Sequence, residues 1–415
     1  MNFPVDAVRA RFPALTVTDG GQPRIYLDAP GGTQICRPAL AAMVAHLEGG
    51  TANAGGAFAT SVETDTMSAA AHAAMADLLG GAPDEIAFGP NMTSLTLAVS
   101  RALAQNWQAG DEIVLTRLDH DANVAPWLLA ARDRGVTVRW LDFDPASGRL
   151  DYAALPDLLG PRTRLVACGG ASNALGSLND VARIVATTRA GSDALVFVDA
   201  VQSVPHVATD VATLGCDLLV CSPYKFFGPH QGVLWARSEL IDRIEAYKVR
   251  PAGNHGAHRF ETGTPSFEGQ AGVLGTIDYL DWLGGEVSTA TDRRGRLRAA
   301  FAACVDYERA LGDRLLAGLA TIPGLTLWGA PSMDDRVPTF AFTVAGIHPD
   351  AIAAHLASHG IFAWSGHFYA VEVIARLGLT DTGGLVRIGL CHYHTAEEVD
   401  RTIAILRQLD RSSRA

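Results

Sequence analysis

Positive charge is scarce in this sequence. Lysine and arginine together number 33 against 44 aspartates and glutamates, so the formal net charge is −11 and the pI is near 5.6. No run of basic residues alternates with aromatic ones. Because nucleic-acid backbones are bound largely through clustered basic side chains, this charge balance argues against a nucleic-acid partner.

Long apolar runs are missing as well. No stretch of the sequence approaches the apolar length of a membrane span, so no membrane association is expected. The first residues, MNFPVDAVRARFPAL, include an acid at Asp6 and lack the apolar core of a secretory signal. The cytoplasm is therefore the expected compartment.

Cysteines are present but follow no pattern. The six cysteines form neither a CxxC pair nor a cluster with histidine. Scattered cysteines are typical of reduced thiols in a cytosolic protein, and no structural zinc site or other metal site is expected. They are Cys36, Cys168, Cys216, Cys221, Cys304 and Cys391.

Apolar residues are abundant but occur in short runs. Hydrophobic residues make up 48% of the 415 positions and charged ones 19%, as in a globular enzyme. This length favours one large and one smaller domain over a single core. Between about residues 84 and 237, strand-like runs alternate with helical segments, which predicts an α/β domain with a mainly parallel sheet. The runs are EIAFG, DEIVLT, TVRWLDF, TRLVACGG, LVFVDA, DLLVCS and GVLWA.

The connection between the last two runs is too short for a parallel crossover. Only residues 223–231 separate them, so this pair is expected to run antiparallel. After about residue 285, the mixture of helices and strands predicts a smaller α+β domain. We therefore expect a large domain (26–285) and a small C-terminal domain (286–415), with an N-terminal segment (1–25) that packs with the small domain.

Two charged side chains follow neighbouring runs of the predicted sheet. The strand in LVFVDA is expected to end at Asp199, and Lys225 lies in the short link after DLLVCS. Ligands gather at the carboxyl ends of strands in such sheets, so both side chains are expected to reach one crevice. A lysine that forms an imine, with an aspartate for the pyridinium nitrogen, indicates pyridoxal phosphate. Taken alone, Asp199 is more commonly a helix cap.

Three other strand ends fit the same cofactor. Met92, Thr93 and Ser94 follow EIAFG at the start of an apolar-periodic helix, where the N-terminus favours a phosphate. His120 follows DEIVLT and offers a flat ring for stacking, and Asn173 follows TRLVACGG as a polar contact. Each segment alone also fits a helix cap, a loop histidine or an asparagine turn. The ordered set favours a cofactor site.

These motifs resemble one known family along nearly the whole chain. The resemblance is to the class V aminotransferases and, within them, to the cysteine desulfurase and selenocysteine lyase-like group. It implies a fold type I enzyme with pyridoxal 5'-phosphate (PLP) as cofactor, and a homodimer with active sites at the subunit interface. The motifs are NMTS, DHDANVAPW, SNALG, VDAVQSVPH, SPYKFFGP, RFETGTP and VRIGLCHYHTAEEVD.

The resemblance also implies roles for individual residues. Lys225 would be the Schiff-base lysine, Asp199 the pyridinium partner and Gln202 the contact to the ring hydroxyl. His120 would stack on the ring and act as acid or base, and Arg387 would hold the substrate carboxylate. Further cofactor contacts would be Met92, Thr93, Ser94, Asn173, Ser222, Tyr224 and, from the neighbouring subunit, Thr264. Further substrate contacts would be Gly31, Gly32, Asn173, His367 and Tyr369.

The sequence departs from the desulfurase pattern at two positions. Tyr224 replaces the histidine that usually precedes the lysine, although its phenol can still donate a hydrogen bond. Tyr369, in GIFAWSGHFYAVEV, stands where a loop such as GHHCA carries the cysteine that takes up sulfur. A phenol cannot form a persulfide, so the usual desulfurase mechanism lacks its nucleophile.

Three functions are compatible with these residues. The first is a desulfurase-like PLP enzyme that acts on a small α-amino acid and eliminates sulfide or another β-leaving group without a persulfide relay. The second is an aminotransferase or epimerase of the same family, which needs the same imine and carbanion. The third is a non-catalytic partner protein that retains the fold, which the intact lysine, aspartate and phosphate loop disfavour.

Overall fold

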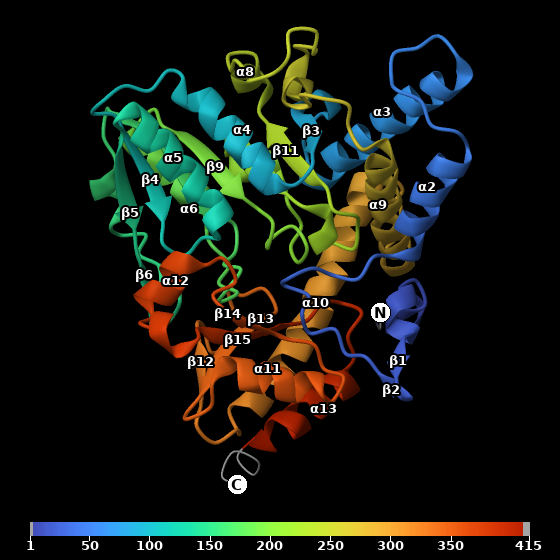
Figure 1. The fold of residues 1–415 in the computed structure, drawn as a ribbon, viewed down its shortest axis with the longest axis vertical. Coiled ribbons are helices and arrows are strands. Elements are labelled where there is room, and N and C mark those ends of the chain that lie inside the picture. The colour runs from blue at the N-terminus through green and yellow to red at the C-terminus, as the bar shows by residue number, and fades with distance from the viewer. Residues whose placement is uncertain (1–2, 410–415) are drawn as a thin grey trace.

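A central sheet of seven strands organises the large domain of the computed structural model, which describes residues 3–409 (Figure 1). The strand order is β3-β11-β10-β9-β8-β4-β5, and all pairings are parallel except those of β11. The expected mainly parallel sheet with one antiparallel strand is confirmed. The strands are β3 (Ile86–Gly89), β4 (Glu112–Thr116), β5 (Thr137–Leu141), β8 (Thr163–Gly169), β9 (Leu195–Asp199), β10 (Leu218–Cys221) and β11 (Gly232–Ala236).

Helices cover both faces of this sheet, which is why its strands are apolar on both sides. On β9, Phe197 points into the core shared with α4 and α5, where its ring meets that of Trp127 at 5.0 Å. Its neighbours Val196 and Val198 point into the opposite core, which includes residues of α3, α6 and α9. The helices are α2 (Arg37–Glu48), α3 (Ala59–Leu79), α4 (Met92–Ala104), α5 (Ala125–Arg134), α6 (Val181–Gly191), α7 (Val211–Leu214), α8 (Ser238–Ile241) and α9 (Phe267–Val287).

A second sheet, with four antiparallel strands in the order β12-β13-β15-β14, forms the smaller C-terminal unit. The long helix α10 leads into it from the large domain (Figure 1). Its elements are α10 (Arg293–Leu319), β12 (Leu325–Trp328), β13 (Thr339–Val344), α11 (Pro349–Ala357), β14 (Trp364–Gly366), α12 (Val371–Arg376), β15 (Leu385–Gly389) and α13 (Ala396–Leu406).

Short elements complete the fold. Two-residue strands form the hairpins β1–β2 (Thr18–Asp19, Gln22–Pro23) and β6–β7 (Phe143–Asp144, Arg149–Leu150). The 3₁₀ helices are η1 (Pro13–Thr16), η2 (Pro83–Glu85), η3 (Asp121–Asn123), η4 (Leu155–Leu158), η5 (Pro223–Lys225), η6 (Gly256–Phe260) and η7 (Thr380–Thr382). Within residues 3–409, no helix is both long and apolar enough to cross a membrane.

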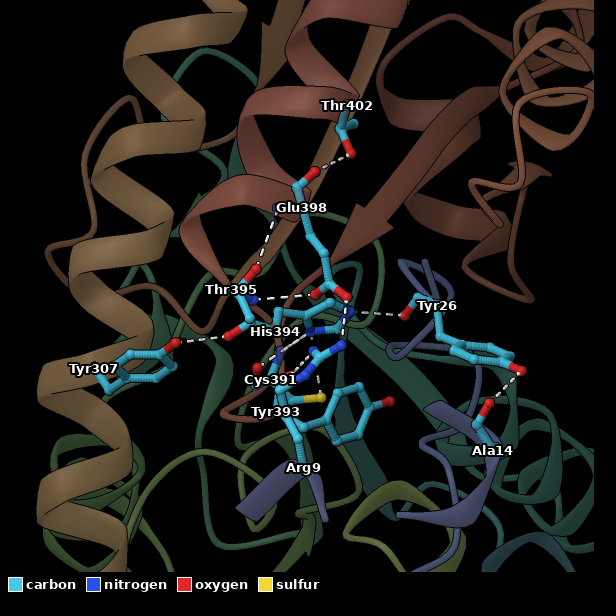
Figure 2. A network of polar contacts seen from close by, with 10 residues as sticks. All are labelled: Arg9, Ala14, Tyr26, Tyr307, Cys391, Tyr393, His394, Thr395, Glu398 and Thr402. Atoms are coloured by element: carbon cyan, nitrogen blue, oxygen red, sulfur yellow. Dashed lines mark hydrogen bonds and ion pairs between the residues drawn. The ribbon is translucent and has the colours of Figure 1, made fainter. Parts of the chain in front are cut away.

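The N-terminal segment is tied to the C-terminal part of the chain (Figure 2). Arg9, at the end of α1 (Val5–Arg9), donates hydrogen bonds to the Tyr393 carbonyl and to Glu398, the latter at 3.0 Å. The buried His394 ring contacts the Tyr26 carbonyl through Nε2 at 3.1 Å. These contacts support packing of the first residues with the small domain, while the domain boundaries themselves stay a prediction.

Candidate active site

One cavity lies at the carboxyl ends of the parallel strands, where ligand sites of α/β sheets form. It brings together nine of the residues predicted from the sequence: Met92, Thr93, His120, Asn173, Asp199, Gln202, Ser222, Tyr224 and Lys225. Its remaining lining residues are Asn91, Asp119, Gly169, Ala171 and Val201.

Lys225 is buried in this cavity, at the end of η5, the short helix that follows β10. Its Nζ donates a hydrogen bond to the Pro30 carbonyl. Burial lowers the pKa of Lys225 to about 7, and the positive charge of Arg387 lowers it further against the opposing charges of Asp199 and Asp28. A large fraction of the amine is therefore neutral near pH 7, which is the form that attacks a carbonyl carbon.

Asp199, the second residue of the predicted Lys225–Asp199 pair, is the last residue of β9. Its Oδ1 accepts a hydrogen bond from the Val201 amide at 3.0 Å. Burial raises the pKa of Asp199 to about 6, although the Val201 amide and the charge of Lys225 act in the other direction. A cationic group placed next to this carboxylate would favour its ionised form, and a pyridinium nitrogen is such a group.

His120 is held as a neutral ring. Its Nδ1 accepts a hydrogen bond from the Ala122 amide at 3.0 Å, so the proton of the ring belongs on Nε2. Burial lowers the pKa of His120 to about 4, with smaller contributions from the charges of Lys225 and Arg387. The Tyr369 ring stacks on the His120 ring at a centroid distance of 5.4 Å.

The start of α4 forms one side of the cavity. Asn91 caps the helix by accepting a hydrogen bond from the Ser94 amide at 2.8 Å. The Ser94 amide is therefore already paired with a hydrogen-bond acceptor. Met92 and Thr93 belong to the cavity lining, but Ser94 does not. Across the cavity, the buried Ser222 Oγ has no hydrogen-bond partner. A phosphate is well suited to this position.

Arg387 approaches the cavity from β15 of the small domain. Its guanidinium donates to the Asn173 carbonyl at 2.8 Å and lies over the Phe368 ring at 4.3 Å from the centroid. Burial lowers the pKa of Arg387 to about 9. Its Nε is buried without a hydrogen-bond partner, so it can donate to a further acceptor such as a carboxylate, while the equally unpartnered Asn173 Oδ1 can accept from a donor.

The residues present fit PLP. Four buried polar atoms around the cavity lack hydrogen-bond partners: Ser222 Oγ, Asn173 Oδ1, Arg387 Nε and Asp28 Oδ1. Buried polar groups are rarely left unpaired, so a polar ligand is expected to contact them. A cofactor with a phosphate at one end, a ring nitrogen and a reactive carbonyl group matches the α4 N-terminus, Asp199 and Lys225 in turn.

The segment that carries Tyr369 closes the site from the small domain. Phe368 and Tyr369 have φ angles of 52° and 58°, a left-handed conformation that is uncommon for residues other than glycine. The Tyr369 carbonyl accepts a hydrogen bond from the Asp121 amide at 2.7 Å, and the His367 ring accepts one from the Tyr369 amide at 3.0 Å. These contacts hold the strained turn against the His120 loop.

The other predicted substrate contacts lie near this cavity rather than in its lining. A Cβ on Gly32 would come within 3.2 Å of the Tyr224 ring, and one on Gly31 within 2.6 Å of the Trp364 indole. Their lack of side chains therefore makes room for those two rings. Thr264 is exposed and lies outside the cavity of its own chain.

The sequence reasoning missed two polar residues of the cavity lining, Asp119 and Asn91, and also Asp28, whose charge acts on Lys225. Asp119 is buried, accepts hydrogen bonds from the Gly169 amide (2.8 Å) and the Asn123 side chain (2.9 Å), and thereby positions the His120 loop. Burial raises the pKa of Asp119 to about 7. Asn91 had a usable signal, since an asparagine before a helix is a common N-cap. Asp119 directly precedes His120, but only the fold shows that it turns inward.

We expect the reactivity of Lys225 in cofactor-free enzyme to titrate near pH 7 instead of near ~10.4. Because the neutral amine reacts, adduct formation with pyridoxal should accelerate as the pH rises through 7 and level off above it. Pyridoxal lacks the phosphate, so no phosphate titration contributes. Stopped-flow absorbance measures the rate, and a midpoint above pH 9 would contradict the prediction.

Comparisons with known proteins agree with this site. The Aminotransferase class-V family matches residues 25–402. The chain is 32% identical to the aminotransferase-like protein FGM3 of Gibberella zeae over 98% of both chains, and 31% identical to a cysteine desulfurase of Yersinia pestis over 99% of both. An apo cysteine desulfurase from Thermococcus onnurineus NA1 superposes with a TM-score of 0.87 at 26% identity, covering 99% of this chain and 98% of the other. The chain therefore belongs to the class V aminotransferase family, and its cofactor is PLP.

Proposed function

We propose that this protein is a PLP-dependent lyase that acts on a small α-amino acid and eliminates a β-leaving group, such as sulfide, without a persulfide relay. The observation that carries the proposal is the position of Tyr369, on the loop that closes the site over His120. This loop is where the resemblance to desulfurases leads one to expect a cysteine. All six cysteines of the chain are buried, and none belongs to the cavity lining.

Different side chains would bind the substrate and remove its proton in such an elimination. PLP, when bound, supplies the electron sink that stabilises negative charge at the substrate Cα. Arg387 binds the substrate carboxylate and so fixes the orientation of the Cα–H bond. Lys225, with its pKa lowered to about 7, removes that proton as the neutral amine. The electron pair of the Cα–H bond then forms the Cα–Cβ double bond as the bond from Cβ to the leaving group breaks.

The products distinguish this reaction from its alternatives. We expect purified enzyme given L-cysteine, or a related amino acid with a β-leaving group, to release pyruvate and ammonia with the leaving group. Alanine formed in equal amount with a cyanide-labile sulfur on Cys36 or Cys391 would contradict the proposal. A 2-oxo acid that retains the substrate side chain would indicate an aminotransferase, as the name of the relative from Gibberella zeae suggests, and a racemised substrate would indicate an epimerase.

Tyr369→Phe tests what the tyrosine does. Tyr369 is 65% exposed and its ring stacks on His120, which suits a residue that forms the wall of the pocket. The substitution keeps the ring and removes the hydroxyl, so we expect kcat to stay within about threefold of wild type, or roughly 0.6 kcal/mol of barrier. A loss of tenfold or more, measured by steady-state kinetics, would assign a proton transfer to the hydroxyl.

A homodimer is also part of the proposal. Thr264 is exposed on the segment before α9, so it is free to contact the phosphate of a neighbouring subunit. We expect sedimentation velocity to give a dimer at the concentrations at which the enzyme is active. An active monomer under those conditions would remove Thr264 from the site.

A further inference from the structure

A second cluster of possible ligands lies away from the active site, between α3, β3 and η6. It contains His72 from α3, His258 from η6 and Glu261, the residue that follows η6. The ligand atoms of these three side chains all lie within 4.8 Å of one another. Two imidazoles and a carboxylate are the donor set that zinc and similar divalent metals take in proteins.

Both ring nitrogens of His72 face oxygen atoms that accept hydrogen bonds. Its Nδ1 lies 2.8 Å from the Ser68 carbonyl, an acceptor, so Nδ1 carries a proton. Its Nε2 lies 2.8 Å from Glu261 Oε1, which is also an acceptor. A neutral His72 therefore directs the lone pair of Nε2 at a carboxylate oxygen, and either a second proton or a metal ion must lie between them.

The surroundings match those of a built metal site. The Ser68 carbonyl fixes the orientation of the His72 ring, and the Phe88 amide donates to Glu261 Oε1 at 2.8 Å. Such hydrogen bonds to the ligands orient them and tune their affinity for a metal. His258 approaches the other carboxylate oxygen with Nδ1 at 3.3 Å and has a side chain 35% exposed, so water can reach a remaining coordination position.

We propose that His72, His258 and Glu261 bind one divalent transition-metal ion of the zinc type, with solvent in the open position. Two ligands at ~2.0–2.1 Å in tetrahedral geometry lie roughly 3.3 Å apart, so the His72–Glu261 contact must widen by about 0.5 Å. The ion would join α3 to the segment that leads to Thr264. Local sequence motifs could not predict this site, because His72 and Glu261 are 189 positions apart.

Untagged holoenzyme titrated with Co²⁺ tests the site, with competition by Zn²⁺ to give its affinity. We expect one Co²⁺ per chain with visible absorption typical of tetrahedral nitrogen and oxygen ligands, and a rise in Tm of about 2 °C at saturating Zn²⁺. His72→Gln and the more exposed His258→Gln should each weaken binding by at least about tenfold. PLP absorbance and circular dichroism check that both variants fold.

His359→Gln is the matched control. The His355 and His359 rings lie 4.7 Å apart on and beside α11 and form a different imidazole pair that could bind the same ions. This variant should bind Co²⁺ as wild type does. Failure of wild type to bind Zn²⁺ at about 100 µM would overturn the proposal, and so would binding that His258→Gln leaves unchanged or that His359→Gln abolishes.

Discussion

Lys225→Ala should lose both the covalent cofactor and the activity. In the wild-type enzyme, borohydride should reduce an imine between PLP and Lys225 and leave a stable adduct. The substitution removes the buried amine that we expect to bind the cofactor and to take the Cα proton. We expect kcat to fall by about 10⁴-fold or more, since a nucleophile and a general base are lost together.

The second lysine of the chain provides a control for this experiment. Its sequence contains only two lysines, Lys225 and Lys248. Lys248 donates to the Ala252 carbonyl at 2.6 Å and has no place in the cavity lining. Lys248→Ala should therefore keep the reducible adduct and wild-type turnover. Mass spectrometry that locates the reduced cofactor on Lys248 would show that the site has been misassigned.

The environment of Lys225 could be predicted only in part from the sequence. The nine-residue link between two apolar runs indicated an antiparallel strand pair with the lysine in the connection, and the sheet confirms this arrangement. Burial and the charge of Arg387, which comes from the small domain, lower the pKa of Lys225. Arg387 lies 214 positions from its hydrogen-bond partner Asn173. The positions of strand ends predict which residues of one sheet lie close together. They do not predict which residues of a second domain, such as Arg387, contact them.

The same limit explains which residues the sequence reasoning missed. Asp199 and Asp119 both follow strands of one sheet, yet only Asp199 lies at the last position of its strand. Asp119 turns inward because Gly169 and Asn123 donate to its carboxylate, and Gly169 belongs to the neighbouring strand β8. Such pairing depends on strand order, which local sequence does not determine. Asn91 was available from local sequence, because N-capping depends only on neighbouring residues.

Asp199→Asn should keep the cofactor but lose most of the turnover. The amide has almost the shape of the carboxylate, so PLP should still bind in equal amount, as measured by its absorbance after gel filtration. A neutral amide cannot keep the ring nitrogen protonated, and the unprotonated ring is a weaker electron sink. We expect kcat to fall by about 10²–10³-fold, the range for loss of one preorganised electrostatic contact.

A cofactor analogue can separate this electrostatic role from a structural one. PLP methylated on its ring nitrogen carries a permanent positive charge and needs no carboxylate to keep it. Asp199→Ala has room for the methyl group. The kcat of this variant should be at least tenfold higher with the methylated cofactor than with PLP. In wild type the methylated cofactor should give no gain, because the methyl group would meet the buried Asp199 carboxylate. Equal activity of Asp199→Ala with both cofactors would mean that Asp199 does not act through the charge of the ring.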